Sequence, residues 1–135
     1  MAVTAFEEDL KVFLAGQETL VLTFTGGFWP GKGPQKELRP YVVYRMDKRN
    51  RDRVLAGVTG KEIRIYAFHI WDPNYTTAKR NAELLVDVFD QKQLTIGPYT
   101  VTSFLDDQID HPYDHEAQLQ MIQTDFEFTF MKYPS

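Results

Sequence analysis

The sequence predicts an α+β fold, with a mostly antiparallel β-sheet, two helices packed on one face and a long β-hairpin arm. Three observations lead to this class. Apolar residues recur at helical spacing in two segments, one near the start of the chain and one in its middle. Several other segments alternate apolar and polar residues, as strands do. A polar, basic stretch is flanked by two of these expected strands, which makes it a hairpin arm.

The stretch from Lys61 to Phe89 is the expected centre of the fold. Lys61–Trp71 is predicted as a strand with apolar residues on both faces, which is typical of a central strand covered at least in part on both sides. Asp72 or Asn74 can cap the helix that follows. The apolar stripe of that helix comprises Tyr75, Ala78, Ala82, Leu85, Val86 and Phe89.

The remaining elements follow from the same periodicities. Thr4–Ala15 is predicted as a helix, because Thr4 and Glu7 form a capping-box pattern ahead of an apolar stripe. Thr19–Thr25 alternates threonine with large apolar residues and is predicted as a strand, and Gly31–Pro40 is predicted as an ordered loop. Further strands are expected at Tyr41–Asp47, Leu94–Ile96, Tyr99–Ile109 and Gln118–Lys132.

The composition indicates a single soluble domain spanning residues 1–135. A hydrophobic content of 43% is enough to fill a core, and the net charge of −4 argues against a dedicated nucleic-acid binder. The chain has no cysteine, which excludes disulfides, thiolate metal sites and a cysteine nucleophile. No signal-peptide pattern is visible, and no apolar run approaches the roughly 20 residues of a membrane helix.

Two segments of opposite charge are the candidate contact surfaces. Arg45–Arg53 has five basic and two acidic residues, and it lacks the interleaved aromatic residues of a stacking nucleic-acid site. It is either a solvated hairpin or a protein-binding arm, for which the acidic stretch Asp106–Glu116 is a complementary partner. Such a pair favours head-to-tail contacts between copies. The interface candidates are Arg45, Lys48, Arg49, Arg51 and Arg53, with Asp106, Asp107, Asp110 and Asp114 as acidic partners.

The Asp106–Glu116 stretch, expected to be a loop, is also the strongest candidate for chemistry. It places His111 and His115 among carboxylates, which is compatible with a divalent metal. Pro112 disfavours a helix that would align the two imidazoles, so that a solvated loop is the simpler interpretation. His69 lies in the central strand and is more simply a core or interface histidine than a general base. The sequence therefore predicts no catalytic, cofactor-binding or metal-binding residue.

Several short segments, taken in order, resemble one known family. These segments are Gly27-Phe28-Trp29-Pro30, Pro34-Gln35, Leu38-Arg39-Pro40-Tyr41-Val42-Val43-Tyr44, Trp71 with Tyr75 and Ala78, and Thr124-Asp125-Phe126. Their order and spacing are similar to the tail terminator and tail-completion proteins of tailed phages, a family that includes head–tail joining proteins. Gly31–Arg39 departs from the family pattern because it is more basic and richer in glycine.

The resemblance implies a structural virion protein without catalysis or cofactors. Members of the family form hexameric rings at the head-proximal end of the tail tube, end its polymerisation and join the tail to the neck. The implied partners are other copies of the chain, the tail tube protein and a connector or stopper protein of the neck, while DNA passes through the lumen without being read. The implied location is the virion, assembled in the host cytoplasm. The alternative is a small metal-dependent or ligand-binding enzyme that uses His111 and His115.

Overall fold

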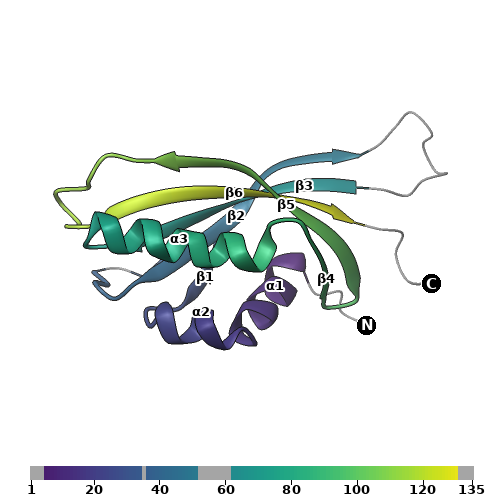
Figure 1. Ribbon diagram of the computed structural model, residues 1–135, viewed down its shortest axis with the longest axis horizontal. Helices are drawn as coiled ribbons and strands as arrows, with labels where there is room; N and C mark the ends of the chain where they lie inside the picture. Colours follow the sequence, from purple (N-terminus) through teal and green to yellow (C-terminus); the bar gives the residue numbers. More distant parts are fainter. Residues whose placement is uncertain (1–4, 35, 52–61, 131–135) are drawn as a thin grey trace.

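A computed structural model describes residues 5–34, 36–51 and 62–130. In these residues three helices lie on one side of a six-stranded sheet (Figure 1). The α+β prediction is therefore confirmed, with one more helix than expected. The elements are α1 (Phe6–Ala15), α2 (Glu18–Thr23), β1 (Phe28–Pro30), β2 (Tyr41–Arg51), β3 (Glu62–Asp72), α3 (Tyr75–Phe89), β4 (Lys92–Ile96), β5 (Tyr99–Asp110) and β6 (Gln120–Phe130).

The sheet has the strand order β1-β2-β3-β6-β5-β4. β1 is parallel to β2, and all other neighbouring strands are antiparallel. β3 pairs with β2 on one side and with β6 on the other, so the strand predicted to be central is central. The predicted hairpin is confirmed as far as the pairing of Arg51 with Glu62, and its tip lies outside the described residues.

The main core lies between the sheet and the helices. Figure 1 shows α3 lying along the sheet, while α1 and α2 cover the part next to β1 and β4. Ala78 and Ala82 of α3 are completely buried, which lets this helix approach the strands closely. The strands contribute a cluster of fully buried aromatic rings to this core, each of which stabilises the fold through its large apolar area: Tyr44, Tyr66, Phe68, Phe126, Phe128 and Phe130.

Both long helices begin near the expected positions, but their caps differ from one another. Asn74 caps α3, because its Oδ1 accepts a hydrogen bond from the N–H of Thr77 at 3.0 Å. Asp72 supports the same turn by accepting from the N–H of Asn74 at 2.8 Å. The N-cap residue of α1 is Ala5, which has no capping side chain, and Thr4 of the expected capping box lies outside the described residues.

The predicted strand at Thr19–Thr25 is wrong, since Glu18–Thr23 forms the helix α2. Leu20 and Phe24, four residues apart, are both buried in the main core. Leu22, which a strand would bury together with them, is 71% exposed. A short apolar run does not distinguish a strand from a helix, and here the packing of two side chains at helical spacing outweighs the β-propensity of threonine and valine.

The loop predicted from Asp106 to Glu116 is partly wrong, whereas the strand predicted at Tyr99–Ile109 is confirmed by β5. Strand β5 continues to Asp110, pairing with β6 as far as Ile122, and the register shifts at Asp106. Carboxylates are tolerated in this part of the strand because they are exposed. The loop therefore begins only at His111.

The second face of the sheet, called the open face below, carries none of the helices in the described residues. A small cluster of Tyr41, Val43 and Leu119, with Trp71 against it, covers its end near the β5–β6 loop. The loop after β1 lies on the same face, because a Cβ atom on Gly33 would come within 2.6 Å of Val43 Cγ2. The expectation that the central strand is covered in part on both sides is met by these contacts. Within the described part of the chain, every helix is too short or too polar to span a bilayer.

Candidate interaction surfaces

The basic arm and the acidic stretch extend toward opposite ends of the sheet. Arg51 lies at the end where β3 and β6 pair as Glu62 with Phe130, next to the start of β5. β5 runs away from that end and finishes at Asp110. Figure 1 shows the β2–β3 hairpin on the right and the β5–β6 loop on the left. The far ends of the two charged segments therefore lie at opposite ends of the sheet, whereas Arg45 and Asp107 lie in the same row across it, with Ala67 and Asp125 between them.

Four of the five basic candidates lie on β2. Arg45 is exposed and is in register with Ala67 of β3. After a register shift at Asp47, the backbones of Lys48, Arg49 and Arg51 pair with β3 opposite Ile65, Arg64 and Glu62. Arg53 lies outside the described residues. The arm is thus an extension of the sheet, at least as far as Arg51.

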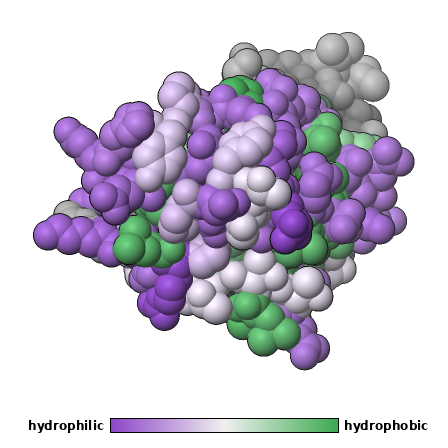
Figure 2. All heavy atoms as spheres, turned by 60° about the vertical axis from the view of Figure 1, so that its left-hand side comes forward, coloured by the Kyte–Doolittle hydropathy of each residue, from purple (hydrophilic) through white to green (hydrophobic). Residues whose placement is uncertain are grey.

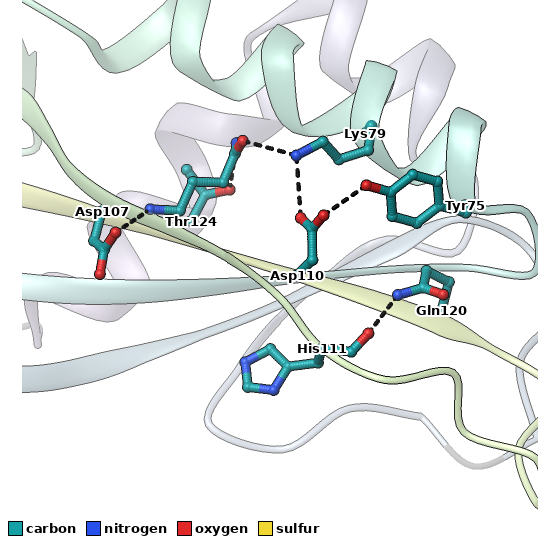
Figure 3. A network of polar contacts seen from close by, with 8 residues as sticks. Tyr75, Lys79, Asp107, Asp110, His111, Gln120 and Thr124 are labelled. Carbon is teal, nitrogen blue, oxygen red and sulfur yellow. Dashed lines mark hydrogen bonds and ion pairs between the residues drawn. The ribbon is translucent and has the colours of Figure 1, made fainter.

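Asp110 is held within its own chain, which the sequence did not indicate. Its carboxylate accepts a hydrogen bond of 2.6 Å from the hydroxyl of Tyr75 and lies 3.0 Å from the ammonium group of Lys79, both on α3 (Figure 3). These two hydrogen bonds lower the pKa of the Asp110 carboxyl below its ordinary value. The contact links the end of β5 to the first turns of α3.

Asp107 and Asp114 also have local partners. Asp114 Oδ1 accepts hydrogen bonds of 3.0 Å from the N–H groups of Glu116 and Ala117, and thereby shapes the turn in the β5–β6 loop. Asp107 Oδ1 accepts from the N–H of Gln108 at 2.8 Å. Asp106 is exposed at the register shift. Among the four acidic candidates, Asp110 is the one whose side chain is bound to another element in the described structure.

Part of β5 is a free sheet edge, which explains why some of its acidic neighbours bind backbone N–H groups. β4 pairs only with residues 99–103 of β5, so that residues 104–110 have no neighbouring strand on that side among the described residues. Asp90 accepts a hydrogen bond of 2.9 Å from the N–H of Leu105, and Asp107 accepts from Gln108 farther along. Side-chain carboxylates thus occupy N–H groups that could otherwise recruit a foreign strand.

Asp125 is a charged residue of the open face that the sequence reasoning missed. It is 7% exposed and is in register with Ala67 on one side and Asp107 on the other. Burial raises the pKa of its carboxyl, against a hydrogen bond of 3.0 Å from Gln123 Nε2 that lowers it. The carboxylates of Asp47, Asp106 and Asp107 raise this pKa further. The cluster draws on three strands, so no sequence spacing could reveal it.

The two histidines of the acidic stretch do not converge. His111 Nε2 lies 2.9 Å from Gln123 Oε1, whereas the ring of His115 packs edge-on against Tyr113 at 5.0 Å. Among residues 5–34, 36–51 and 62–130, no three histidine, aspartate or glutamate side chains form a group that could hold a metal ion. The metal-dependent alternative therefore finds no geometric support in the described residues.

His69 lies on the open face, half-buried between Val43 and Gln123 of the neighbouring strands. Burial lowers the pKa of its imidazole, and electrostatic interaction with Arg45 and with the nearby ring of His111 lowers it further, against an opposing contribution from Asp47. The ring is therefore neutral at pH 7.

Figure 2 shows a mostly hydrophilic surface on the side that includes the β5–β6 loop, with small separate hydrophobic patches.

Comparison with known proteins gives structural matches only. No protein-family model matches the sequence, and no curated protein is significantly similar to it. A chain from the structure described as "Virion of native gene transfer agent (GTA) particle" has the same fold, with a TM-score of 0.67 and 12% sequence identity. The alignment covers 91% of this chain and 93% of that chain. A second solved chain, recorded without a descriptive name, gives a TM-score of 0.59 at 14% identity and covers 97% of this chain and 94% of its own length.

Proposed function

We propose that this protein is a structural component of a phage-like virion, which forms a ring at the head-proximal end of the tail tube. In this role it ends tube polymerisation and joins the tail to the neck. The ring is hexameric, and its partners are the tail tube protein and a connector or stopper protein. DNA passes through the ring without being read, and the ring is assembled in the host cytoplasm. No catalysis is part of this function.

The observation that carries the proposal is the shared fold with a chain of a gene transfer agent virion. The match extends over nearly the whole length of both chains. Identity of 12% leaves the role open, and the resemblance of the local segments to tail terminators supplies the more specific assignment. The two lines of support are independent, because one rests on the backbone and the other on short sequence segments.

The placement of charge is compatible with a ring. An interface between a basic surface and an acidic surface is heterologous, and such contacts generate rings when the rotation closes. Contacts of this kind need two separate surfaces on one molecule. The part of β2 beyond Tyr44 and the part of β5 beyond Ser103 meet this need, because they are the free edges on opposite sides of the described sheet. Asp110 is paired with Lys79 of α3, and Asp114 accepts from two N–H groups of its own turn. The preferred acidic partners of the arm in this proposal are therefore Asp106 and Asp107, which are exposed on the free edge of β5.

The test is assembly of a charge-reversed variant. Arg49→Glu combined with Arg51→Glu should abolish the ring, because like charges would then meet across the interface. Native mass spectrometry and negative-stain electron microscopy measure the assembly, alone and with tail tube protein present. Circular dichroism should show an unchanged fold. Adding Asp106→Lys and Asp107→Lys to the same chain should restore the ring, since the attraction is then re-formed with exchanged signs.

The matched control reverses two exposed charges elsewhere. Arg80→Glu with Lys92→Glu makes the same change of net charge on α3 and β4, and should leave assembly intact. A ring that survives the Arg49 and Arg51 reversal would refute the interface assignment. A chain that remains monomeric with every tail and neck protein, and is absent from purified particles, would refute the function itself.

A further inference from the structure

A small pocket on the open face lies between the loop after β1 and the side chains of β2 and β3. It has a volume of about 270 Å³. The loop closes one side, where Gly33 lies so close to β2 that a Cβ atom would meet Val43 and Tyr41. His69 and Trp71 of β3 line the other side. Of its lining residues, only Arg45 belongs to the arm used in the proposed function.

One wall of the pocket is apolar and aromatic. The rings of Tyr41 and Trp71 are stacked, with centroids 6.2 Å apart and planes inclined by 17°. Val43 adjoins them and is 8% exposed. Tyr41 itself is 7% exposed, so most of its surface is packed against neighbouring side chains. An occupant must therefore present an apolar part to this wall.

The charged side chains of the pocket are both cations, Lys32 and Arg45. Among the described residues neither has an ion-pair partner, whereas Arg39, Arg64 and Lys79 are each paired with a carboxylate. No aspartate or glutamate is among the described residues that line the pocket. In a chain with a net charge of −4, two unpaired cations beside an aromatic wall are a local excess of positive charge.

The neighbouring groove differs from the pocket in charge. The adjacent groove, about 510 Å³, shares Pro34 and Tyr41 with the pocket, but its lining includes Asp114 and Glu116 as well as Lys36. It already provides its own negative charge. Asp47 is the carboxylate that acts on His69 from outside the pocket lining, and Arg45 acts on the same ring with the opposite sign. The smaller pocket therefore lacks a negative group of its own.

We propose that this pocket binds a carboxylate side chain of a partner protein, presented on an extended acidic segment with an aliphatic residue beside it. The carboxylate lies between Lys32 and Arg45, and the aliphatic residue packs on Tyr41 and Trp71. Guanidinium and ammonium groups bind carboxylates through charge-assisted hydrogen bonds, and the apolar wall lowers the local dielectric around them. The volume fits one or two side chains, which defines a peptide-docking site and not a site for a large ligand.

The experiment is an NMR titration of the full ¹⁵N-labelled chain with the peptide acetyl-Leu-Glu-Leu-amide. The indole N–H of Trp71 and the amide of Gly33 should shift, with a Kd on the order of 1 mM. The neutral peptide acetyl-Leu-Gln-Leu-amide should bind at least about tenfold more weakly, because hydrogen bonds from cations to a carboxylate are stronger than those to an amide. Binding of the acidic peptide should also weaken as the salt concentration rises.

Substitutions of the two cations test whether the acidic peptide binds in this pocket. Arg45→Gln and Lys32→Gln should each reduce affinity about tenfold or more, whereas the control Arg80→Gln removes an equal charge from exposed helix α3 and should have no effect. Equal shifts with the glutamine peptide, or an unchanged titration of Arg45→Gln, would overturn the proposal. If dilution alone shifts the same resonances and Glu116→Gln removes that dependence, the occupant is a second copy and the partner assignment is wrong. None of these readouts depends on ring formation.

Discussion

On the helix-covered face of the sheet, strands β3 and β6 present Tyr66, Phe68, Phe126 and Phe128, and all four rings are fully buried. On the open face, the alternate residues of the same strands include the half-buried His69 and Gln123 and the buried Asp125. The two sets of residues are neighbours in sequence and differ only in the side of the sheet to which they point. One face is therefore built for stability, and the other keeps polar groups available for contacts.

The largest expected difference between the faces is in core packing. Phe128→Ala should lower the free energy of unfolding by about 3–5 kcal/mol, since it leaves a cavity among Phe6, Tyr66 and Phe89, whose ring centroids lie 5.5–5.8 Å away. Chemical denaturation measures the change. Glu127→Ala, the adjacent residue on the open face, is the control and should change the same quantity by about 0.5 kcal/mol or less. Similar losses in both variants would erase the distinction between the faces.

An intermediate effect is expected at Asp125. Because its pKa is raised in the folded state, the folded chain holds this proton more tightly than the unfolded chain, whose aspartate pKa is about 3.9. The contribution of Asp125 to the free energy of unfolding is therefore lost as the pH rises from about 3.9 through the folded-state pKa. Asp125→Asn keeps an acceptor for Gln123 and should raise the free energy of unfolding at pH 7 by up to about 1 kcal/mol.

The gain should disappear below pH of about 3.9, where the wild-type carboxyl is neutral as well. Denaturation curves at several pH values measure it. A variant that is less stable than the wild type at pH 7 would show that the Asp125 charge contributes favourable contacts that outweigh its burial.

The smallest effect concerns the exposed contact between α3 and β5. Tyr75→Phe removes the hydrogen bond that contributes most to lowering the pKa of Asp110, so that this pKa should rise toward its ordinary value while Lys79 still keeps it below. Carboxyl-carbon NMR measures the titration, with Tyr113→Phe as the control. Because the folded-state pKa of Asp110 lies below the unfolded value, this carboxyl stabilises the fold above a pH of about 3.9. The stabilisation is lost as the pH falls through the folded-state pKa. An unchanged Asp110 titration would refute the contact.

Much of the fold could be predicted because it depends on local periodicity. The strand and helix expected between Lys61 and Phe89 correspond to β3 and α3, and the hairpin and the last strand are also present. The prediction failed at Thr19–Thr25, where alternation over a few residues allowed two interpretations. From Asp106 to Ile109 two predictions overlapped: the strand at Tyr99–Ile109 is confirmed by β5, and the loop inferred from charge is wrong there. In both cases the contacts with the rest of the molecule decided the outcome.

The candidate surfaces were predictable only as charged segments. Sequence reasoning identified a basic arm and an acidic stretch, but it treated the four aspartates as equivalent. The structure separates Asp110, bound to α3, from Asp106, which is exposed at a register shift. It also adds Asp125 and the pocket beside Arg45, which combine residues from several strands and have no spacing signature.

The sequence by itself determined which segments alternate, which form the long helices and where charge accumulates, because these properties depend on residues a few positions apart. The tertiary structure alone decided the strand order, the helix at Glu18–Thr23 and the partners of each charge. Tyr75 and Asp110 are 35 positions apart, and their side chains meet only because β6 lies between β3 and β5 in the sheet that α3 covers. Contacts of this kind arise from the packing of whole elements, which no local pattern encodes.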